Sequence, residues 1–380
     1  MLAISSVSCS RPETKVARNW DPKAAAAYLD YRAGWWMEWS GAARDQGTFC
    51  ISCHTALPYA LARPSLRAAL TEDDPSEYEH RLIENVEKRV RLWNKVAPYY
   101  SERGYDHKTA ESRGTESVLN AVILAGRDSR QGHLNDTTLA ALGNMWELQL
   151  QAGEDEGAWA WLQFDQEPWE ANDSAYYGAT LAAIAVGTAP DHYASSPEIQ
   201  THLNLLREYL RRQSATQSTI NRVFLLWAST KLPGLLDPEQ QKSIIDEALS
   251  RQQSDGGWRL ASIAWRWKGW SVKSLLKMWL REDGTPLEGR SDGVATGVIT
   301  YVLEEAGVPR ENAQLKSGLA WLKNNQNMAE GFWPASSVNK RKSMTSDTGR
   351  FMSDAATAYA VLALTANQQA ATPVASVPHH

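Results

Sequence analysis

The chain has 380 residues, of which 43% are hydrophobic and 22% are charged, and its formal net charge is −5. This balance is typical of a folded globular protein and excludes intrinsic disorder, which needs few apolar residues and a large net charge. It also argues against nucleic-acid binding, because no basic excess is present to neutralise phosphates. Two counts are unusual: there are 17 Trp against 5 Phe, and of the 3 Cys two lie close together.

The first nine residues, MLAISSVSC, are small and apolar, and polar residues follow them. One interpretation is the remnant of an export signal in which Cys9 carries a lipid, and it predicts a periplasmic or exported protein. The other interpretation is a frayed tail, which with a complete amino terminus predicts a cytoplasmic protein. Under either interpretation we expect residues 1–20 to lie outside the folded domains.

Beyond this tail most apolar residues recur at helical spacing, and few segments alternate like strands. Asp21-Pro22 opens the first expected helix, because proline is favoured at the first helical position. We expect a helical segment over 21–75, a larger domain over 76–366 and a flexible tail over 367–380. Helices of the larger domain are expected near 77–96, 115–126, 137–151, 173–186, 196–212, 218–231, 238–252, 292–305, 312–326 and 354–366.

These helices are of two chemical kinds that alternate along the chain. One kind is amphipathic and charged, such as HLNLLREYLRRQ at 202–213, and the other is small and apolar nearly all round, such as SAYYGATLAAIAVG at 174–187. A helix that is apolar on every side has to be buried on every side. We therefore predict an all-α fold in which helical hairpins close into a ring, with apolar helices inside and amphipathic helices outside, rather than an open solenoid.

A recurring turn separates a charged helix from the apolar helix that follows it. Three copies run from Gln151 to Trp159, from Gln253 to Trp258 and from Gln326 to Trp333, and each contains an acidic residue and glycine. Glycine permits a positive φ after a helix end, and tryptophan can cover the turn while its indole N–H finds a partner. We expect most of the Trp excess to fasten these turns rather than to serve catalysis.

The three turns resemble the QW repeats of the squalene–hopene cyclase and prenyltransferase-like superfamily of terpenoid cyclases, and Gln253-Ser-Asp-Gly-Gly-Trp258 matches best. The resemblance covers roughly residues 80–366. It implies an α/α toroid around an apolar central cavity, and an enzyme that acts on an isoprenoid-type small molecule. Aromatic faces suit such a ligand, because they favour hydrocarbon and stabilise carbocations. The resemblance is also compatible with peripheral membrane association.

Class II cyclases of this superfamily use an Asp-x-Asp-Asp motif whose middle Asp protonates the substrate. The corresponding segment here is Glu170-Ala-Asn172-Asp173, and the amide of Asn172 cannot donate a strongly acidic proton. Asp165, Glu167 and Glu170 lie just upstream and could supply an acid in an altered register. The candidate catalytic carboxylates are Asp165, Glu170 and Asp173. The alternative is that Asp173, together with Asp292 and Asp354, only caps the start of an inner helix.

The prenyltransferases of the superfamily bind zinc through an Asp-x-Cys pair and a distant His, and no Asp-x-Cys occurs in this sequence. A diphosphate ligand would need cations, and Lys340-Arg341-Lys342 with Arg350 is the candidate cluster. A basic run of this kind is more often a solvated loop.

Cys50-Ile-Ser-Cys53-His54 matches the Cys-x-x-Cys-His motif of c-type haem attachment. Two thiols at this spacing add to the two vinyl groups of haem, and His54 would be the axial ligand of the iron. The alternatives are a Cys-x-x-Cys redox or disulfide pair and a zinc site, which would need a fourth ligand. Haem attachment would require export and a redox partner.

Three functional hypotheses follow from the sequence. The first is an exported toroid that binds or transforms a terpenoid or other apolar lipid, with haem c at Cys50, Cys53 and His54. The second is a divergent isoprenoid cyclase or transferase without a cofactor, in which the cysteines are structural. The third is a non-catalytic lipid-binding toroid that has kept the ring and lost the acid.

Overall fold

The computed structural model describes residues 19–100, 106–265 and 279–369. The regular secondary structure of the described chain is almost wholly helical, which confirms the predicted all-α class. Its strands in these ranges are β1 (Ala43–Arg44) and β2 (Thr48–Phe49), which pair as a short antiparallel hairpin. Cys9 and most of both predicted tails lie outside the described residues.

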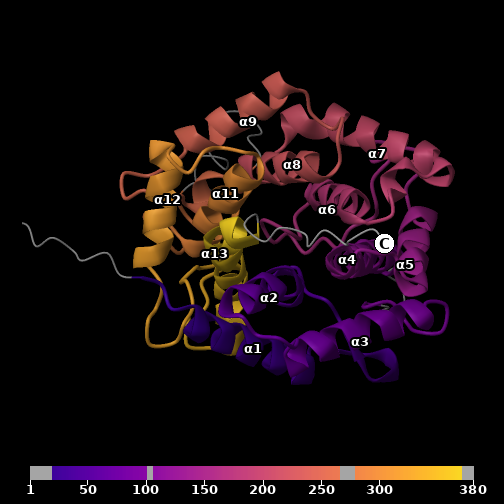
Figure 1. Cartoon of the computed structure of the whole chain (residues 1–380), viewed down its shortest axis with the longest axis horizontal. Coiled ribbons are helices and arrows are strands. Elements are labelled where there is room, and N and C mark those ends of the chain that lie inside the picture. Colours follow the sequence, from indigo (N-terminus) through magenta and orange to yellow (C-terminus); the bar gives the residue numbers. More distant parts are fainter. Residues whose placement is uncertain (1–18, 101–105, 266–278, 370–380) are drawn as a thin grey trace, which may run out of the picture.

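The helices form two layers, with one set surrounding the other (Figure 1). The surrounding helices are α1 (Pro22–Glu38), α3 (Glu77–Arg91), α5 (Asp136–Glu147), α7 (Gln200–Gln213), α9 (Pro238–Ser250) and α12 (Ala313–Asn324). The inner helices are α2 (Ala56–Leu70), α4 (Asp106–Gln131), α6 (Ser174–Thr188), α8 (Thr219–Lys231), α11 (Gly293–Glu305) and α13 (Phe351–Gln369).

Each inner helix contacts the next one along the chain, and α13 returns to contact α2, so that the inner contacts form a closed circuit. The apolar composition of these helices explains their place. Every residue of α6 from Ser174 to Val186 is buried, and so is every residue of α11 from Gly293 to Leu303. The helices of 21–75 share one hydrophobic core with those of 76–366. Helix α2 completes the inner circuit, and α1 packs against α2 and α13 from the outer layer.

Helix α2 lies within the helical segment expected over 21–75, although its own bounds were not predicted, and it contains two prolines. Pro58 lies in the first turn, where its missing N–H costs nothing, whereas Pro64 lies inside the helix. Both prolines are buried, and Ser52 stabilises the start of the helix by accepting the backbone N–H groups of Thr55 and Ala56. Packing against α13 and α4 therefore outweighs the local sequence preference.

The tryptophans of the three turns fasten them as expected. Trp159, Trp258 and Trp333 are completely buried. Each indole N–H donates to a backbone carbonyl near the end of the preceding outer helix, and the acceptors are Met145, Ala248 and Leu322. Each turn is thus tied back to the helix from which it emerges.

Glutamines at these turns join each outer helix to the next. The side chains that reach across are those of Gln149, Gln252 and Gln326; the first two stand before Gln151 and Gln253, the glutamines at which the predicted turns begin. Their amide groups donate to carbonyls at the start of the following outer helix, namely those of His202 on α7, Gln314 on α12 and Asp21 before α1. The third turn therefore connects the carboxyl-terminal part of the chain to its first helix.

A glycine with positive φ lies at the point where each turn meets the next outer helix. Gly331 has φ +83°, and a Cβ added there would lie 2.1 Å from the carbonyl oxygen of Ala24. Gly307 has a similar φ of +79°, but a Cβ there would meet nothing within 4 Å. The two glycines form a natural comparison between backbone strain alone and strain combined with a steric clash.

We expect Gly307→Ala to lower the free energy of unfolding by about 1 kcal/mol and Gly331→Ala by about 3 kcal/mol, because only the second also forces α1 away. Chemical denaturation of both variants measures the difference. Equal losses would show that the turn does not press against α1.

Candidate functional site

The segments that precede α2, α6 and α13 meet at one end of the ring. We define the mouth as residues 49–55, 163–173 and 335–354. The backbone N–H of Glu167 donates to the side-chain oxygen of Asn339 (3.0 Å), and the Asn339 amide donates to the Glu167 carbonyl (2.8 Å). The Thr55 hydroxyl donates to the carboxylate of Asp354 (2.7 Å), which joins the first of these segments to the third. The mouth therefore brings both parts of the predicted site, the cysteine motif and the carboxylate segment, to one place.

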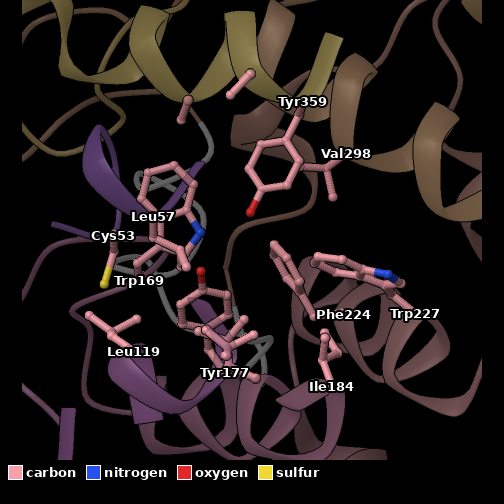
Figure 2. Close-up of a cluster of buried hydrophobic side chains, with 14 of the residues drawn as sticks. Cys53, Leu57, Leu119, Trp169, Tyr177, Ile184, Phe224, Trp227, Val298 and Tyr359 are labelled. Carbon is pink, nitrogen blue, oxygen red and sulfur yellow. The ribbon is translucent and has the colours of Figure 1, made fainter. Parts of the chain in front are cut away.

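Aromatic side chains fill the ring interior below the mouth (Figure 2). Tyr177 and Phe224 pack edge to face with centroids 4.8 Å apart, and Phe224 contacts Tyr359 at 6.1 Å. The hydroxyl groups of Tyr177 and Tyr359 and the indole N–H groups of Trp169 and Trp227 are buried. The interior is apolar, with a few buried polar atoms.

The cysteine motif links the β-hairpin to α2. The indole of Trp36 donates to the carbonyl of Cys50 (2.8 Å), and both Cys50 and Cys53 are buried free thiols. Burial raises the pKa of Cys50 to about 11 and that of Cys53 well above its ordinary value, and the negative charge of Glu170 adds to both shifts. Both thiols are therefore protonated at neutral pH, which argues against a reactive thiolate.

The imidazole of His54 is held by aromatic rings. It stacks on Phe351 with centroids 4.0 Å apart, and Trp36 meets it edge-on at 5.1 Å. Burial lowers the pKa of His54 to about 3, and the positive charges of Lys342 and Arg32 contribute. His54 is consequently neutral across the physiological range, which is the state that a metal ligand requires.

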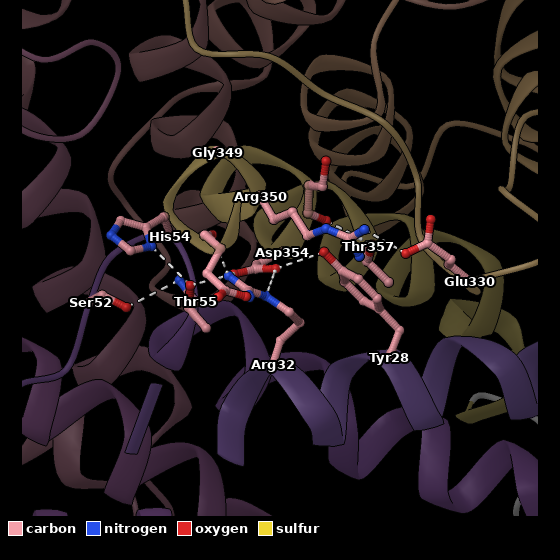
Figure 3. Close-up of polar contacts among 12 residues, drawn as sticks. Tyr28, Arg32, Ser52, His54, Thr55, Glu330, Gly349, Arg350, Asp354 and Thr357 are labelled. Atoms are coloured by element: carbon pink, nitrogen blue, oxygen red, sulfur yellow. Dashed lines mark hydrogen bonds and ion pairs between the residues drawn. The ribbon is translucent and has the colours of Figure 1, made fainter. Parts of the chain in front are cut away.

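Asp354 lies at the centre of a buried hydrogen-bond network (Figure 3). Its carboxylate accepts the Tyr28 hydroxyl (2.8 Å), two nitrogens of Arg32 (2.8 and 3.0 Å) and the Thr55 hydroxyl (2.7 Å). Arg32 also pairs with Asp347 at 2.9 Å. Four donors occupy the capacity of the two carboxylate oxygens, so Asp354 has no proton to offer a substrate.

The three predicted catalytic carboxylates occupy different environments. Asp165 is exposed on a loop with φ +54°, and Asp173 is half-buried at the N-cap position of α6, where its side chain makes no capping bond. Glu170 is half-buried beside the cysteine motif. Burial raises its pKa from the ordinary 4.5 to about 7, although Lys108 and Lys342 act in the opposite direction. Of the three, Glu170 is the one that the structure brings to the cysteines.

The expectation that Asp173, Asp292 and Asp354 all cap inner helices is correct for one residue. Asp292 accepts the backbone N–H of Ala295 (3.0 Å) at the start of α11. Asp173 stands at the cap position without that bond, and Asp354 lies in the first turn of α13, where it is bound to Arg32 instead. The residue before Asp173, Asn172, is exposed.

A second concave region lies beside the start of α11 and was not foreseen. It is a pocket of about 220 Å³, lined among others by Asp255, Arg259, Asp292, Trp321 and Ala335. Both carboxylates at this pocket are engaged. Asp292 accepts two backbone N–H groups, and Asp255, which is exposed, accepts the Ser291 hydroxyl (2.6 Å) and the Trp321 indole N–H (3.2 Å). These bonds account for both carboxylates as parts of the scaffold.

Sequence reasoning missed the residues that support His54, which are Tyr28, Arg32 and Thr55. A signal was present for one of them: Arg32 stands in a largely apolar part of α1, which Ala33 and Trp36 continue. A charged residue on a buried face needs a buried partner. The identity of that partner, 322 residues away, was not readable from the sequence.

The His, Cys, Asp and Glu side chains of the mouth can be compared with what zinc and haem each require. In the ranges that the structure describes, no three His, Cys, Asp or Glu side chains are arranged to hold a metal ion, which gives the zinc interpretation no support. Cys50, Cys53 and His54 provide the two free thiols and the neutral imidazole that the protein contributes to haem attachment. Within the described ranges, no helix has the length and apolar character needed to cross a bilayer.

Comparisons with known proteins add little. No family model and no curated protein matches the chain. Among solved structures, a polysaccharide lyase is similar to it with a TM-score of 0.37 and 12% sequence identity, over 96% of this chain and 93% of that chain. At this level of similarity no conclusion about fold or function follows.

We expect Asp354→Ala to lower the free energy of unfolding by about 3–5 kcal/mol, because it leaves Arg32 buried without its main partner. The double variant Arg32→Met/Asp354→Leu should lose less than the two single losses combined, since it leaves neither charge behind. Denaturant unfolding of the single and double variants measures this coupling. Additive losses would mean that the pair does not act as a unit.

We expect the stability of the parent chain to fall, relative to Glu170→Gln, as the pH rises from about 5 to 8. Between 4.5 and 7 the folded chain keeps a proton on Glu170 that the unfolded chain has released, so folding weakens as that proton is lost. The amide side chain of the variant does not titrate, and this slope is therefore absent from it. Unfolding midpoints of both proteins across the pH range provide the test, and parallel curves would contradict it.

Proposed function

We propose that this chain is a squalene-cyclase-like α/α toroid that carries a c-type haem at its mouth and binds or transforms an isoprenoid-type or other apolar lipid. The observation that carries the proposal is the state of the Cys50–His54 segment. Two free thiols precede a neutral imidazole that is fixed by Phe351 and by its bond to Thr55. Haem attachment would convert the two thiols into thioethers and would use the imidazole as an iron ligand.

Cys50 and Cys53 would hold the group through thioether bonds, and His54 would ligate its iron. Haem supplies one-electron transfer when it is bound. The protein's own contribution is the surroundings: the aromatic rings of Trp36 and Phe351 hold the imidazole in place and keep the site apolar. A site of this kind predicts export and a redox partner.

The support for an apolar ligand is the aromatic interior. Phe224, Trp227 and Tyr359 present faces that favour hydrocarbon. Since these side chains pack against one another, a lipid that reaches the interior has to separate them. Cyclisation started by protonation is the less favoured reaction, because Asp354 is saturated with donors and Asn172 replaces the expected acid.

A second candidate is a divergent cyclase or transferase without haem. One observation favours it: Glu170 has a pKa of about 7 and lies near the mouth, so it could act as a general acid at neutral pH. In that case Cys50 and Cys53 are buried structural thiols. If the chain is instead a non-catalytic lipid-binding toroid, Glu170 has no catalytic role.

We expect the full chain, produced in the periplasm together with haem-attachment machinery, to show a Soret band that survives extraction with acid–acetone. Covalent haem stays with the protein, whereas adventitious haem is extracted. Cys50→Ser/Cys53→Ser should abolish the band, and Cys9→Ser, which removes the remaining thiol of the chain, should leave it unchanged. The absence of an extraction-resistant band in the parent chain would refute the haem proposal.

Incubation with squalene or a prenyl diphosphate separates the two candidates. A cyclised or transferred product that is lost in Glu170→Gln and kept in Cys50→Ser/Cys53→Ser would favour the haem-free enzyme. Bound lipid recovered unchanged would favour the non-catalytic ring. Product analysis by mass spectrometry distinguishes these results.

A further inference from the structure

A chain of hydrogen bonds connects His54 to the last inner helix (Figure 3). We propose that Thr55 and Asp354 are positioning residues that fix His54 as the tautomer protonated on Nδ1, and so leave Nε2 as the nitrogen with a free electron pair. The use of that electron pair as an iron ligand rests on the proposed function. The assignment of the tautomer rests on the hydrogen bonds alone.

The first step is the state of Asp354. Arg32 binds it through two nitrogens, with Nε 2.8 Å from Oδ1 and a terminal nitrogen 3.0 Å from Oδ2, and this is the geometry of a guanidinium on an ionised carboxylate. Tyr28 donates to Oδ1 as well. An ionised carboxylate accepts hydrogen bonds and donates none. The hydroxyl of Thr55, 2.7 Å from Oδ2, must therefore be the donor in its bond to Asp354.

The second step follows from the single hydrogen of a hydroxyl group. Since the hydrogen of Thr55 points to Asp354, its oxygen can only accept from its other neighbour. That neighbour is Nδ1 of His54, 2.9 Å away. Nδ1 must carry the proton, because an unprotonated Nδ1 would set two electron pairs against each other. A neutral imidazole with its proton on Nδ1 has Nε2 unprotonated.

The backbone and the ring plane are fixed independently of this chain. Ser52 accepts the backbone N–H groups of Thr55 (3.2 Å) and Ala56 (3.0 Å), which holds the start of α2. Phe351 stacks on the imidazole of His54 and belongs to the same helix as Asp354. One helix thus sets both the plane of the ring and the position of its proton.

The tautomer decides what His54 can do. A metal-binding histidine usually donates its second ring N–H to an acceptor that orients the ring, and removing such an acceptor typically costs about 10- to 100-fold in metal affinity or activity. Thr55 is that acceptor here. Asp354 accepts the hydroxyl hydrogen of Thr55, so that the Thr55 oxygen is left to accept from His54. The acceptor is a side chain rather than a backbone carbonyl, so it can be removed by one substitution.

The test is ¹⁵N NMR of the full chain labelled at histidine and produced without haem-attachment machinery. The chain has eight His, and the signals of His54 are identified by their loss in His54→Gln. We expect the parent chain to show a protonated Nδ1 and an unprotonated Nε2 at His54 at neutral pH. A protonated Nε2 in the parent chain would overturn the proposal, whatever the variants show.

Variants of Thr55 separate positioning from packing. Thr55→Ser keeps the hydroxyl and should keep the tautomer of the parent chain. Thr55→Val keeps the shape and should lose the single tautomer, so that signals of both forms or of the Nε2-protonated form appear. Thr365→Val is the matched control, because the hydroxyl of this buried threonine on α13 bonds only to its own helix. A Thr55→Val protein with the tautomer of the parent chain would refute a role for Thr55.

The outcomes distinguish this proposal from the haem proposal. If the tautomer is as stated but no haem is attached, the positioning chain stands and the haem proposal fails. If haem is attached while His54 in the unloaded chain is protonated on Nε2, the haem proposal stands and the positioning proposal fails. In the protein with haem attached, Thr55→Val should shift the reduction potential of the haem, whereas Thr55→Ser should have the potential of the parent protein.

Discussion

A buried ion pair ties the first helix of the ring to the last, between Arg32 of α1 and Asp354 of α13. Both side chains are about 1% exposed, and the pair joins α1 to α13 across 322 residues of sequence. Taking the two charges out of water is costly, so the pair persists because the hydroxyl groups of Tyr28 and Thr55 supply further hydrogen bonds. The same carboxylate that closes the ring therefore also organises the start of α2 and the histidine of the mouth.

Much of the scaffold was predictable from the sequence, because its signals are local. Apolar helices and tryptophan turns follow from composition and spacing, and the buried Trp159, Trp258 and Trp333 match that expectation. Helix α2 lies in the helical segment that was expected, but its bounds were not predicted, because the local penalty of Pro64 is overcome by packing that the sequence does not display. The role of Asp354 was missed for a related reason: its partner Arg32 is distant in sequence, and an acidic residue near a helix start suggests a cap.

The candidate site was predictable only in part. The Cys50–His54 motif is a local pattern, and Glu170 was singled out from its resemblance to an acid motif, but their proximity is a product of the fold. Burial then changes their chemistry. It keeps both thiols protonated and His54 neutral, and it holds a proton on Glu170 close to neutral pH. No single segment carries that information, because each shift arises from the neighbours that the ring assembles.

The third tryptophan turn, in which Gln326 and Gly331 rest on the start of α1, has a consequence for biosynthesis. The helices that flank the cysteine motif are translated before the turn and the helix that cover them. The apolar hairpin of α1 and α2 therefore remains uncovered until α12, the turn and α13 have folded against it. Until then the sulfur atoms of Cys50 and Cys53, which are shielded in the folded ring, are open to reagents that the closed ring excludes.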